Sequence, residues 1–185
     1  MSNIVVILSP TNEGSEVRMK ESQDAAEQVG QIDLRIVDSK QSFDDVAEQC
    51  QGAVVVVPHG KYDELTKLAK KIGSLKLVQT PSAGTDWIDK AALAELGVDV
   101  ANNGGANAVA VAEHAIGLMF STNRKLDVQI ESVKQGTWMA GVEGDRTEFH
   151  TLVGKRIGII GLGRIGSRVA KRLAGWECEL VYHDI

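Results

Sequence analysis

Short apolar runs alternate with longer amphipathic segments through the first hundred residues. The apolar runs are NIVVIL at 3–8, IDLRIV at 32–37, GAVVVVP at 52–58, LKLVQT at 75–80 and VDVANN at 98–103. Between them lie segments such as SFDDVAEQC, YDELTKLAKKIG and WIDKAALAELG, which space their apolar residues as a helix does. This alternation of strands and helices predicts a parallel sheet whose two faces are covered by helices.

A cluster of asparagine and glycine residues at 102–105 interrupts the alternation and indicates a domain boundary. We therefore expect one domain over residues 1–102 and a second over residues 103–185. The second domain is expected to begin with one long helix over residues 107–133, because the apolar positions there keep a helical period. The glycine-containing stretch at 136–150 has no clear period and predicts a surface loop.

The composition argues against several classes of protein. The chain has 185 residues, a hydrophobic fraction of 43% and a formal net charge of -5, which are typical of a globular protein. Lys and Arg are scattered along the sequence, so we expect no nucleic-acid partner. The start lacks a signal-peptide pattern and the most apolar stretch is interrupted by charge, so we expect no membrane association and a cytoplasmic location. Cys50 and Cys178 lack metal-ligand spacing, and we expect no metal site.

One glycine motif carries specific chemistry. Gly161, Gly163 and Gly166 stand in G-x-G-x-x-G order between an apolar run and a segment of helical spacing. In a dinucleotide site the first glycine permits a tight turn, the second lets the backbone approach a pyrophosphate, and the third lets helix and strand pack closely. A second apolar run, CELVYH, leads to Asp184, whose carboxylate would bind ribose hydroxyls and repel a 2′-phosphate. The pattern predicts an NAD site, and the alternative is a structural turn of similar sequence.

Three blocks of sequence resemble one enzyme family. They are LKLVQTPSAGTDWID at 75–89, GVDVANNGGANAVAVAEHAIGLMF at 97–120 and LVGKRIGIIGLGRIGSRVAKRLAGW at 152–176. Together they resemble the D-isomer-specific 2-hydroxyacid dehydrogenases, a group that includes D-3-phosphoglycerate dehydrogenase and glyoxylate/hydroxypyruvate reductase. The resemblance implies an α/β fold in which a flavodoxin-like parallel-sheet substrate domain over 1–102 precedes the first βαβ unit of a Rossmann NAD-binding domain over 103–185. The long helix would then be an interdomain helix.

The resemblance also implies a substrate site. In the family, the loop that matches Ala83 and Gly84 holds the substrate carboxylate through backbone N–H groups, which suits small residues because the main chain must come close. This chain departs from the family at Ala83, where relatives often have Thr or Val. Without the family, the same loop would be interpreted as a turn capped by Thr85 or Asp86.

The cofactor residues follow from the same resemblance. Arg164 and Ile165 match family positions whose backbone contacts the pyrophosphate of NAD, and Asp184 matches the family's ribose carboxylate. The full set of expected cofactor-binding residues is Gly161, Gly163, Arg164, Ile165, Gly166 and Asp184.

The chemistry implied by the family is hydride transfer between NAD(H) and a small 2-hydroxy or 2-oxo acid. In relatives, the histidine, the acidic residue and the arginine of the reaction all follow the second Rossmann strand, so we assign no catalytic residue in this chain. We therefore expect a chain truncated relative to its relatives, with an open strand edge that favours a homodimer or pairing with a complementary chain. The alternative is a non-catalytic fragment that binds a nucleotide or a protein partner.

Glu113, His114 and His59 are further candidates for a chemical role. Glu113 and His114 are neighbours on a predicted helix, and adjacent helical residues point about 100° apart, so they cannot face one substrate together. His59 follows the apolar run at 52–58, where a parallel strand would deliver a side chain to a cleft. A solvent-facing loop histidine is the simpler interpretation of His59.

Overall fold

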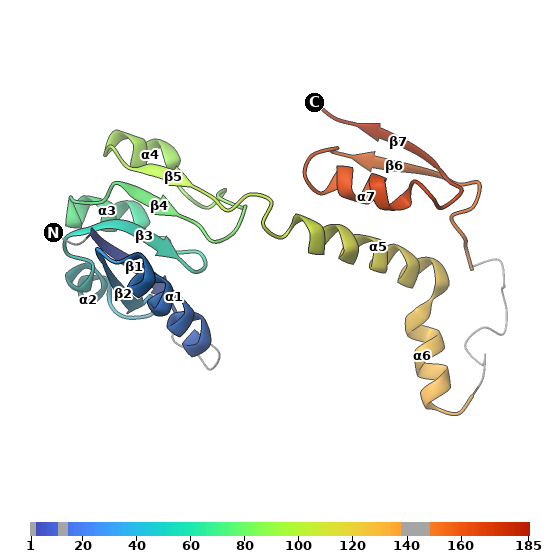
Figure 1. Cartoon of the computed structure of the whole chain (residues 1–185), viewed down its shortest axis with the longest axis horizontal. Coiled ribbons are helices and arrows are strands. Elements are labelled where there is room, and N and C mark those ends of the chain that lie inside the picture. The colour runs from blue at the N-terminus through green and yellow to red at the C-terminus, as the bar shows by residue number, and fades with distance from the viewer. Residues whose placement is uncertain (1–2, 11–14, 138–148) are drawn as a thin grey trace. The chain divides into compact units, whose positions relative to one another are not determined.

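The computed structural model describes residues 3–10, 15–137 and 149–185. The chain divides into two compact units, Met1–Gly104 and Gly105–Ile185 (Figure 1). Within the described ranges, the first unit contains a five-stranded sheet and the second a two-stranded sheet.

The first unit is built on a sheet in which every paired strand is parallel. Its strands are β1 (Asn3–Ser9), β2 (Ile32–Asp38), β3 (Ala53–Pro58), β4 (Leu77–Gln79) and β5 (Asp99–Ala101), in the order β2-β1-β3-β4-β5. This is the flavodoxin-like order, so the predicted fold class is confirmed. The direction of the chain along the sheet reverses between β1 and β3, and in such sheets this point lies beside the ligand site.

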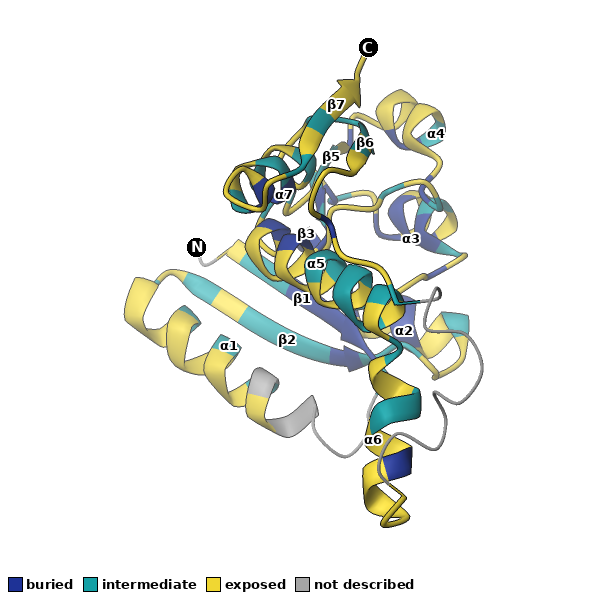
Figure 2. Cartoon of the chain, turned by 90° about the vertical axis from the view of Figure 1, so that its right-hand side faces the viewer, coloured by how far each residue is buried: buried dark blue, intermediate teal, exposed yellow. Residues whose placement is uncertain are grey.

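Four helices connect these strands. They are α1 (Ser15–Val29), α2 (Phe43–Gln49), α3 (Leu65–Ile72) and α4 (Lys90–Glu95). Figure 2 shows α1 on one side of the sheet and the other three helices on the opposite side. Leu65, Leu68, Ala69 and Ile72 on α3 are buried at helical spacing, which explains why this segment is a helix against the sheet. Gly73 ends α3 in the left-handed conformation, with a φ of 63°.

The core of the first unit lies between the central strands and these helices. Val6, Val56 and Val78 on three adjacent strands have no exposed surface. Cys50, at the end of α2, belongs to the same core, and burial raises the pKa of its thiol to about 11 despite the opposing charge of Arg35. Cys50 is therefore a packing residue with little thiolate at neutral pH.

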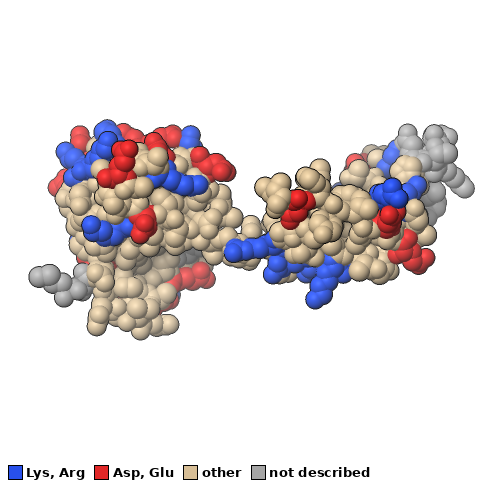
Figure 3. All heavy atoms as spheres, turned by 90° about the horizontal axis from the view of Figure 1, so that it is seen from above, with Lys and Arg blue, Asp and Glu red and all other residues tan. Residues whose placement is uncertain are grey.

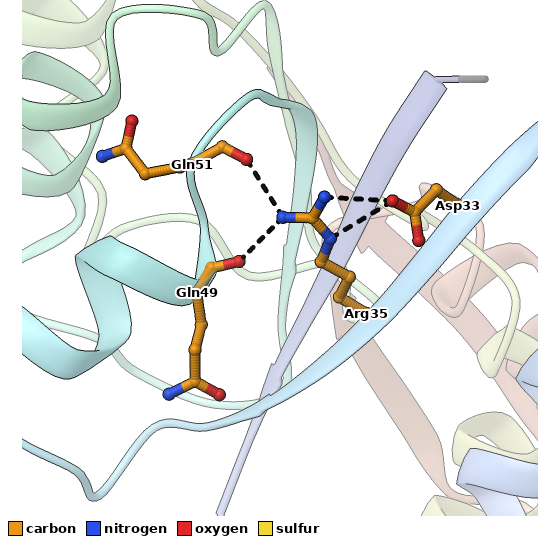
Figure 4. Close-up of polar contacts among 4 residues, drawn as sticks. All are labelled: Asp33, Arg35, Gln49 and Gln51. Atoms are coloured by element: carbon orange, nitrogen blue, oxygen red, sulfur yellow. Dashed lines mark hydrogen bonds and ion pairs between the residues drawn. The ribbon is translucent and has the colours of Figure 1, made fainter. Parts of the chain in front are cut away.

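Arg35 ties β2 to the end of α2 (Figure 4). Its Nη1 atom donates to the carbonyl oxygens of Gln49 at 3.2 Å and Gln51 at 3.0 Å. On its other side, Nε and Nη2 donate to Oδ2 of Asp33 at 3.3 and 3.0 Å. A single guanidinium thus supplies donors to carbonyls at a helix end, where the helix itself has no N–H groups left.

The second unit contains α5 (Ala108–Arg124), α6 (Leu126–Lys134), β6 (Arg156–Ile160), α7 (Gly166–Leu173) and β7 (Glu179–His183). β6 and β7 pair in parallel, with Ile160 opposite His183 at the carboxyl end. Its buried cluster contains Leu152, Val169 and Leu173, with residues of α5 packed against them. The predicted strand-helix-strand arrangement around the glycine motif is present.

The prediction of one helix over 107–133 is wrong, because the helix breaks at Lys125. Lys125 has a φ of 47° and separates α5 from α6. The carbonyls at the end of α5 are satisfied by other donors: His150 N–H donates to Asn123 O at 3.0 Å, and the side chain of Gln129 donates to Arg124 O. A bond from a distant segment therefore replaces one that a continuous helix would make. The predicted loop over 136–150 lies largely outside the described residues.

The surface of the described residues carries mixed charge. Figure 3 shows acidic and basic side chains interspersed over the visible face of the first unit. None of the helices within 3–10, 15–137 and 149–185 is long and apolar enough to cross a bilayer. Over the same ranges, no cluster of three His, Cys, Asp or Glu residues is arranged to hold a metal ion.

Replacing Arg35 with Ala should lower the free energy of unfolding by about 1 kcal/mol, because two carbonyls at the end of α2 lose a charged donor. The matched variant Asp33→Asn leaves those two bonds in place, so it should cost less than about 0.5 kcal/mol. Urea unfolding followed by circular dichroism measures both values. If both variants lowered the free energy of unfolding equally, the hydrogen bonds from Arg35 to the two carbonyls would not be the source of its stabilising effect.

Candidate functional site

The glycine motif forms a sharp turn between β6 and α7. Gly161 directly follows β6 and has a φ of 88°, a conformation that side-chain-bearing residues rarely adopt. Its N–H donates to His183 O at 2.8 Å, which continues the pairing of β6 with β7 into the turn. The turn is therefore fixed at the carboxyl edge of the two strands.

Gly166 makes the closest contact in this turn. A Cβ atom at Gly166 would lie 2.0 Å from the carbonyl oxygen of Gly161 and 3.2 Å from Cγ2 of Ile159. The first of these atoms belongs to the backbone and cannot rotate away. Only glycine fits here, and its absence of a side chain lets the start of α7 pack directly on the turn.

Gly163 has the opposite environment. A Cβ atom there would have no described heavy atom within 4 Å, so the backbone at Gly163 is open to the surroundings. The first turn of α7 has no acidic residue, and Ile165 at its N-cap makes no side-chain cap bond. The positive end of the helix dipole is therefore not offset by an acidic group from its own first turn, and an anion would be stabilised at this position.

Asp184 lies against the same turn. Its Oδ2 atom accepts a hydrogen bond from the backbone N–H of Leu162 at 2.9 Å, and its Oδ1 atom accepts one from Ile185 N–H at 3.0 Å. The parallel pairing of β6 with β7 brings the ends of both strands to one edge, which explains this proximity. An ionised carboxylate has further acceptor positions, so it can also bind hydroxyl groups of a ligand.

Arg164 and Ile165 occupy exposed positions of the turn. The side chain of Arg164 crosses Gly105, where a Cβ atom would lie only 2.7 Å from its Cδ. The Arg164 side chain is flexible and could move away from an added Cβ atom, so the φ of 92° is what favours glycine at this position. Sequence reasoning placed Gly105 in a breaker cluster and missed this contact, because nothing in the local sequence indicates which side chain lies over a glycine.

The loop with Ala83 and Gly84 follows β4 in the first unit, and both residues are exposed. The side chain of Asn102 donates to Ala83 O at 2.8 Å, and Asn103 N–H donates to Ser82 O at 3.1 Å. β4 and β5 are neighbouring strands. The residues that follow β5 therefore hold the loop that follows β4. Sequence reasoning missed the role of Asn102, although its position after the adjacent parallel strand was an available signal.

Glu113 and His59, two of the other candidates for a chemical role, lie in different units of the chain. Oε1 of Glu113 on α5 pairs with Nη2 of Arg172 on α7 at 2.8 Å, which is a link between two helices. His59 lies where β1 and β3 end, and its N–H donates to Leu8 O at 2.7 Å. His59 is thus at the reversal point of the first sheet.

The residues present fit a dinucleotide. They combine a tight turn at Gly161, an open backbone at Gly163, a close helix contact at Gly166 and a carboxylate at Asp184 on the adjacent strand. These are the features that let a pyrophosphate meet a helix N-terminus while a ribose meets an acidic group.

Replacing Gly166 with Ala should lower the free energy of unfolding by about 2 kcal/mol or more, because the new methyl group overlaps a backbone carbonyl. The control is Gly175→Ala, in which the added Cβ would meet no described heavy atom within 4 Å. Chemical denaturation monitored by circular dichroism compares the two. A Gly166→Ala variant as stable as the control would show that α7 does not pack on the turn as described.

Comparison with known proteins gives a consistent result for this site. A sequence model of the D-isomer specific 2-hydroxyacid dehydrogenase NAD binding domain matches residues 116–185. The chain is 38% identical over 135 residues to D-3-phosphoglycerate dehydrogenase of Archaeoglobus fulgidus, covering 71% of this chain and 24% of that protein. It is 36% identical over 125 residues to a glyoxylate/hydroxypyruvate reductase of Arabidopsis thaliana, covering 68% of this chain and 38% of that protein.

Solved structures extend the comparison to nearly the whole chain. The NAD-dependent formate dehydrogenase of Staphylococcus aureus, solved in complex with NAD, matches with a TM-score of 0.76 and 27% identity, covering 98% of this chain and 56% of that one. The chain spans less than half the length of the curated relatives it matches. From these matches and the site described above, the chain belongs to the D-isomer-specific 2-hydroxyacid dehydrogenase family.

Proposed function

We propose that this chain forms part of an NAD-dependent oxidoreductase that transfers hydride between NAD(H) and a small 2-hydroxy or 2-oxo acid. The observation that carries the proposal is the glycine turn, where Gly166 packs on Gly161 and the backbone of Gly163 is exposed. Asp184 lies against the same turn, where its carboxylate accepts a hydrogen bond from Leu162 N–H. The family match over residues 116–185 supports the same assignment. When bound, the nicotinamide would supply or accept the hydride.

The cofactor-binding residues in this proposal are Gly161, Gly163, Arg164, Ile165, Gly166 and Asp184. The backbone from Gly163 to Ile165 and the N-terminus of α7 would hold the pyrophosphate. The carboxylate of Asp184, already oriented by Leu162 N–H, would accept hydrogen bonds from the adenosine ribose. A carboxylate at this position would repel a 2′-phosphate, so the proposed cofactor is NAD rather than NADP.

The proposed substrate site is the loop with Ala83 and Gly84. Its backbone N–H groups would bind the carboxylate of the acid, and the bonds from Asn102 and Asn103 would keep the loop in position. In this proposal, residues 1–102 form the substrate domain and residues 103–185 belong to the NAD-binding domain. The division of the chain between Gly104 and Gly105 supports that arrangement.

The proposal assigns no catalytic residue to this chain, so turnover by the 185 residues alone is not part of it. The alternative is a non-catalytic chain that binds a nucleotide or a partner. Single-turnover oxidation of NADH with glyoxylate, hydroxypyruvate or pyruvate separates the two when this chain is combined with a polypeptide that supplies the family's arginine, acidic residue and histidine. The proposal predicts a reaction in that assembly, whereas the alternative predicts none.

A homodimer and a cytoplasmic location complete the proposal. Leu118, Ile130 and Val133 on α5 and α6 are each more than half exposed, and such apolar surface favours a protein partner. Light scattering of the purified chain tests the dimer.

Replacing Gly163 with Val should weaken NADH binding by about tenfold or more, since a loss of ~1.4 kcal/mol corresponds to that factor. The added side chain would occupy the open space where the pyrophosphate would meet the backbone. Calorimetry measures the affinity, and an unchanged circular dichroism spectrum verifies the fold. Gly175→Ala is the control and should bind NADH normally; wild-type affinity in Gly163→Val would remove the pyrophosphate assignment.

Replacing Asp184 with Asn should reduce the preference for NADH over NADPH, because the amide keeps the shape of the side chain without its charge. Asp184→Ala should in addition weaken NADH binding by about tenfold, as expected when hydrogen bonds to a charged group are lost. Titrations of both nucleotides into the three proteins measure these effects. A wild-type chain that binds the two nucleotides equally would contradict the assignment.

A further inference from the structure

A cavity of about 420 Å³ lies in the second unit, away from the glycine turn. It is bounded by the end of α5, by the segment that leads into β6 and by a residue between α7 and β7. Among the described residues, its lining is made of Phe120, Arg124, His150, Thr151, Leu152, Val153 and Trp176. A cavity of this volume is within the range of small-molecule sites.

The walls of this cavity are held by backbone hydrogen bonds. His150 N–H donates to Asn123 O at 3.0 Å, which joins the segment before β6 to the end of α5. Gly154 N–H donates to Glu177 O at 2.8 Å, which joins the same segment to the chain after α7. Leu152, between these two bonds, is 8% exposed and belongs to the core of the unit. These bonds fix the backbone on two sides of the cavity, which lowers the cost of ordering it around a ligand.

Two aromatic side chains in contact with one another line the cavity. The rings of Phe120 and Trp176 have centroids 4.4 Å apart and an interplanar angle of 31°. Trp176 is nevertheless 45% exposed, and Val153 beside it is 57% exposed. Large apolar side chains left open in a formed cavity favour an apolar ligand, and aromatic rings favour another flat ring.

Among the lining residues of this largely apolar cavity, Arg124 carries a permanent positive charge. Within the described part of the chain, its guanidinium takes part in no ion pair. A guanidinium binds a carboxylate through two parallel hydrogen bonds, so an anionic group next to a ring would satisfy both features of the cavity.

The cavity and the glycine turn lie at opposite ends of the same two strands. Leu152 and Val153 precede β6, and Trp176 precedes β7, whereas Gly161 and Asp184 follow these strands. β6 and β7 have five residues each and span about 16 Å. A small ligand in the cavity therefore cannot also contact the glycine turn. A ligand in the cavity would be distinct from the proposed cofactor and substrate.

We propose that this cavity is a second small-molecule site, specific for an aromatic carboxylate of one or two fused rings that stacks on Trp176 and pairs with Arg124. The site is independent of the proposed NAD function, and its occupation requires neither NAD nor the loop with Ala83.

The test uses the whole 185-residue chain and two probes, indole-3-carboxylate and its neutral analogue indole-3-carboxamide. Heteronuclear NMR follows the indole N–H signal of Trp176, assigned by its loss in Trp176→Phe, with the signal of Trp87 in the first unit as an internal reference. The carboxylate should shift the Trp176 signal saturably and leave that of Trp87 unchanged, and saturating NADH should not displace it. The carboxamide should bind about tenfold more weakly, as expected for loss of a charge-assisted pair.

Two variants complete the test. Arg124→Gln should weaken the carboxylate by about the same tenfold and leave carboxamide binding unchanged, since it removes the proposed ionic partner alone. Lys134→Gln removes a positive charge from the same unit outside the cavity and should bind as the unchanged chain does. The proposal is overturned if both probes bind equally, if Arg124→Gln keeps full affinity, or if NADH displaces the acid. It is also overturned if the Trp176 signal responds to protein concentration rather than to the acid, because a second copy would then cover the cavity.

Discussion

The contact between Gly166 and the carbonyl oxygen of Gly161 is the constraint on which the second unit depends. A Cβ atom at Gly166 would lie only 2.0 Å from the carbonyl oxygen of Gly161, so this position excludes every side chain. The absence of a side chain sets how closely the start of α7 packs on the turn after β6. That closeness directs the N-terminus of α7 at the turn and leaves the backbone of Gly163 open. A partial positive charge and an accessible main chain therefore occupy the same place, which is the physical requirement for holding a pyrophosphate.

Parallel pairing arranges both units in the same way. In the second unit it places Asp184, at the end of β7, beside Leu162 in the turn after β6. In the first unit it lets Asn102, after β5, hold the loop that follows β4. Polar groups from neighbouring strands gather at the carboxyl edge because all strands of each sheet end there. The opposite ends of β6 and β7 instead border an aromatic cavity, so one short pair of strands separates two different chemical environments.

Much of this arrangement could be predicted because its signals are local. The parallel sheet follows from apolar runs alternating with helical segments, and the turn follows from three glycines at fixed spacing between a strand and a helix. The position of Asp184 follows from the length of one βαβ unit. The prediction over 107–133 was wrong because the segment has a helical period throughout, yet Lys125 adopts a φ of 47° and separates two helices. The carbonyl of Asn123 there accepts a hydrogen bond from His150, a donor that no local pattern reveals.

The element types, the parallel sheets, the glycine turn and the family could be read from the sequence, since each depends on residues close together in the chain or on short blocks. The folded structure was needed to show that Arg164 lies over Gly105, that Asn102 binds the carbonyl of Ala83 and that the Phe120 ring contacts Trp176. These contacts join segments that are distant in sequence. Their geometry depends on how the strands and helices pack together, which the order of residues in any one segment does not contain.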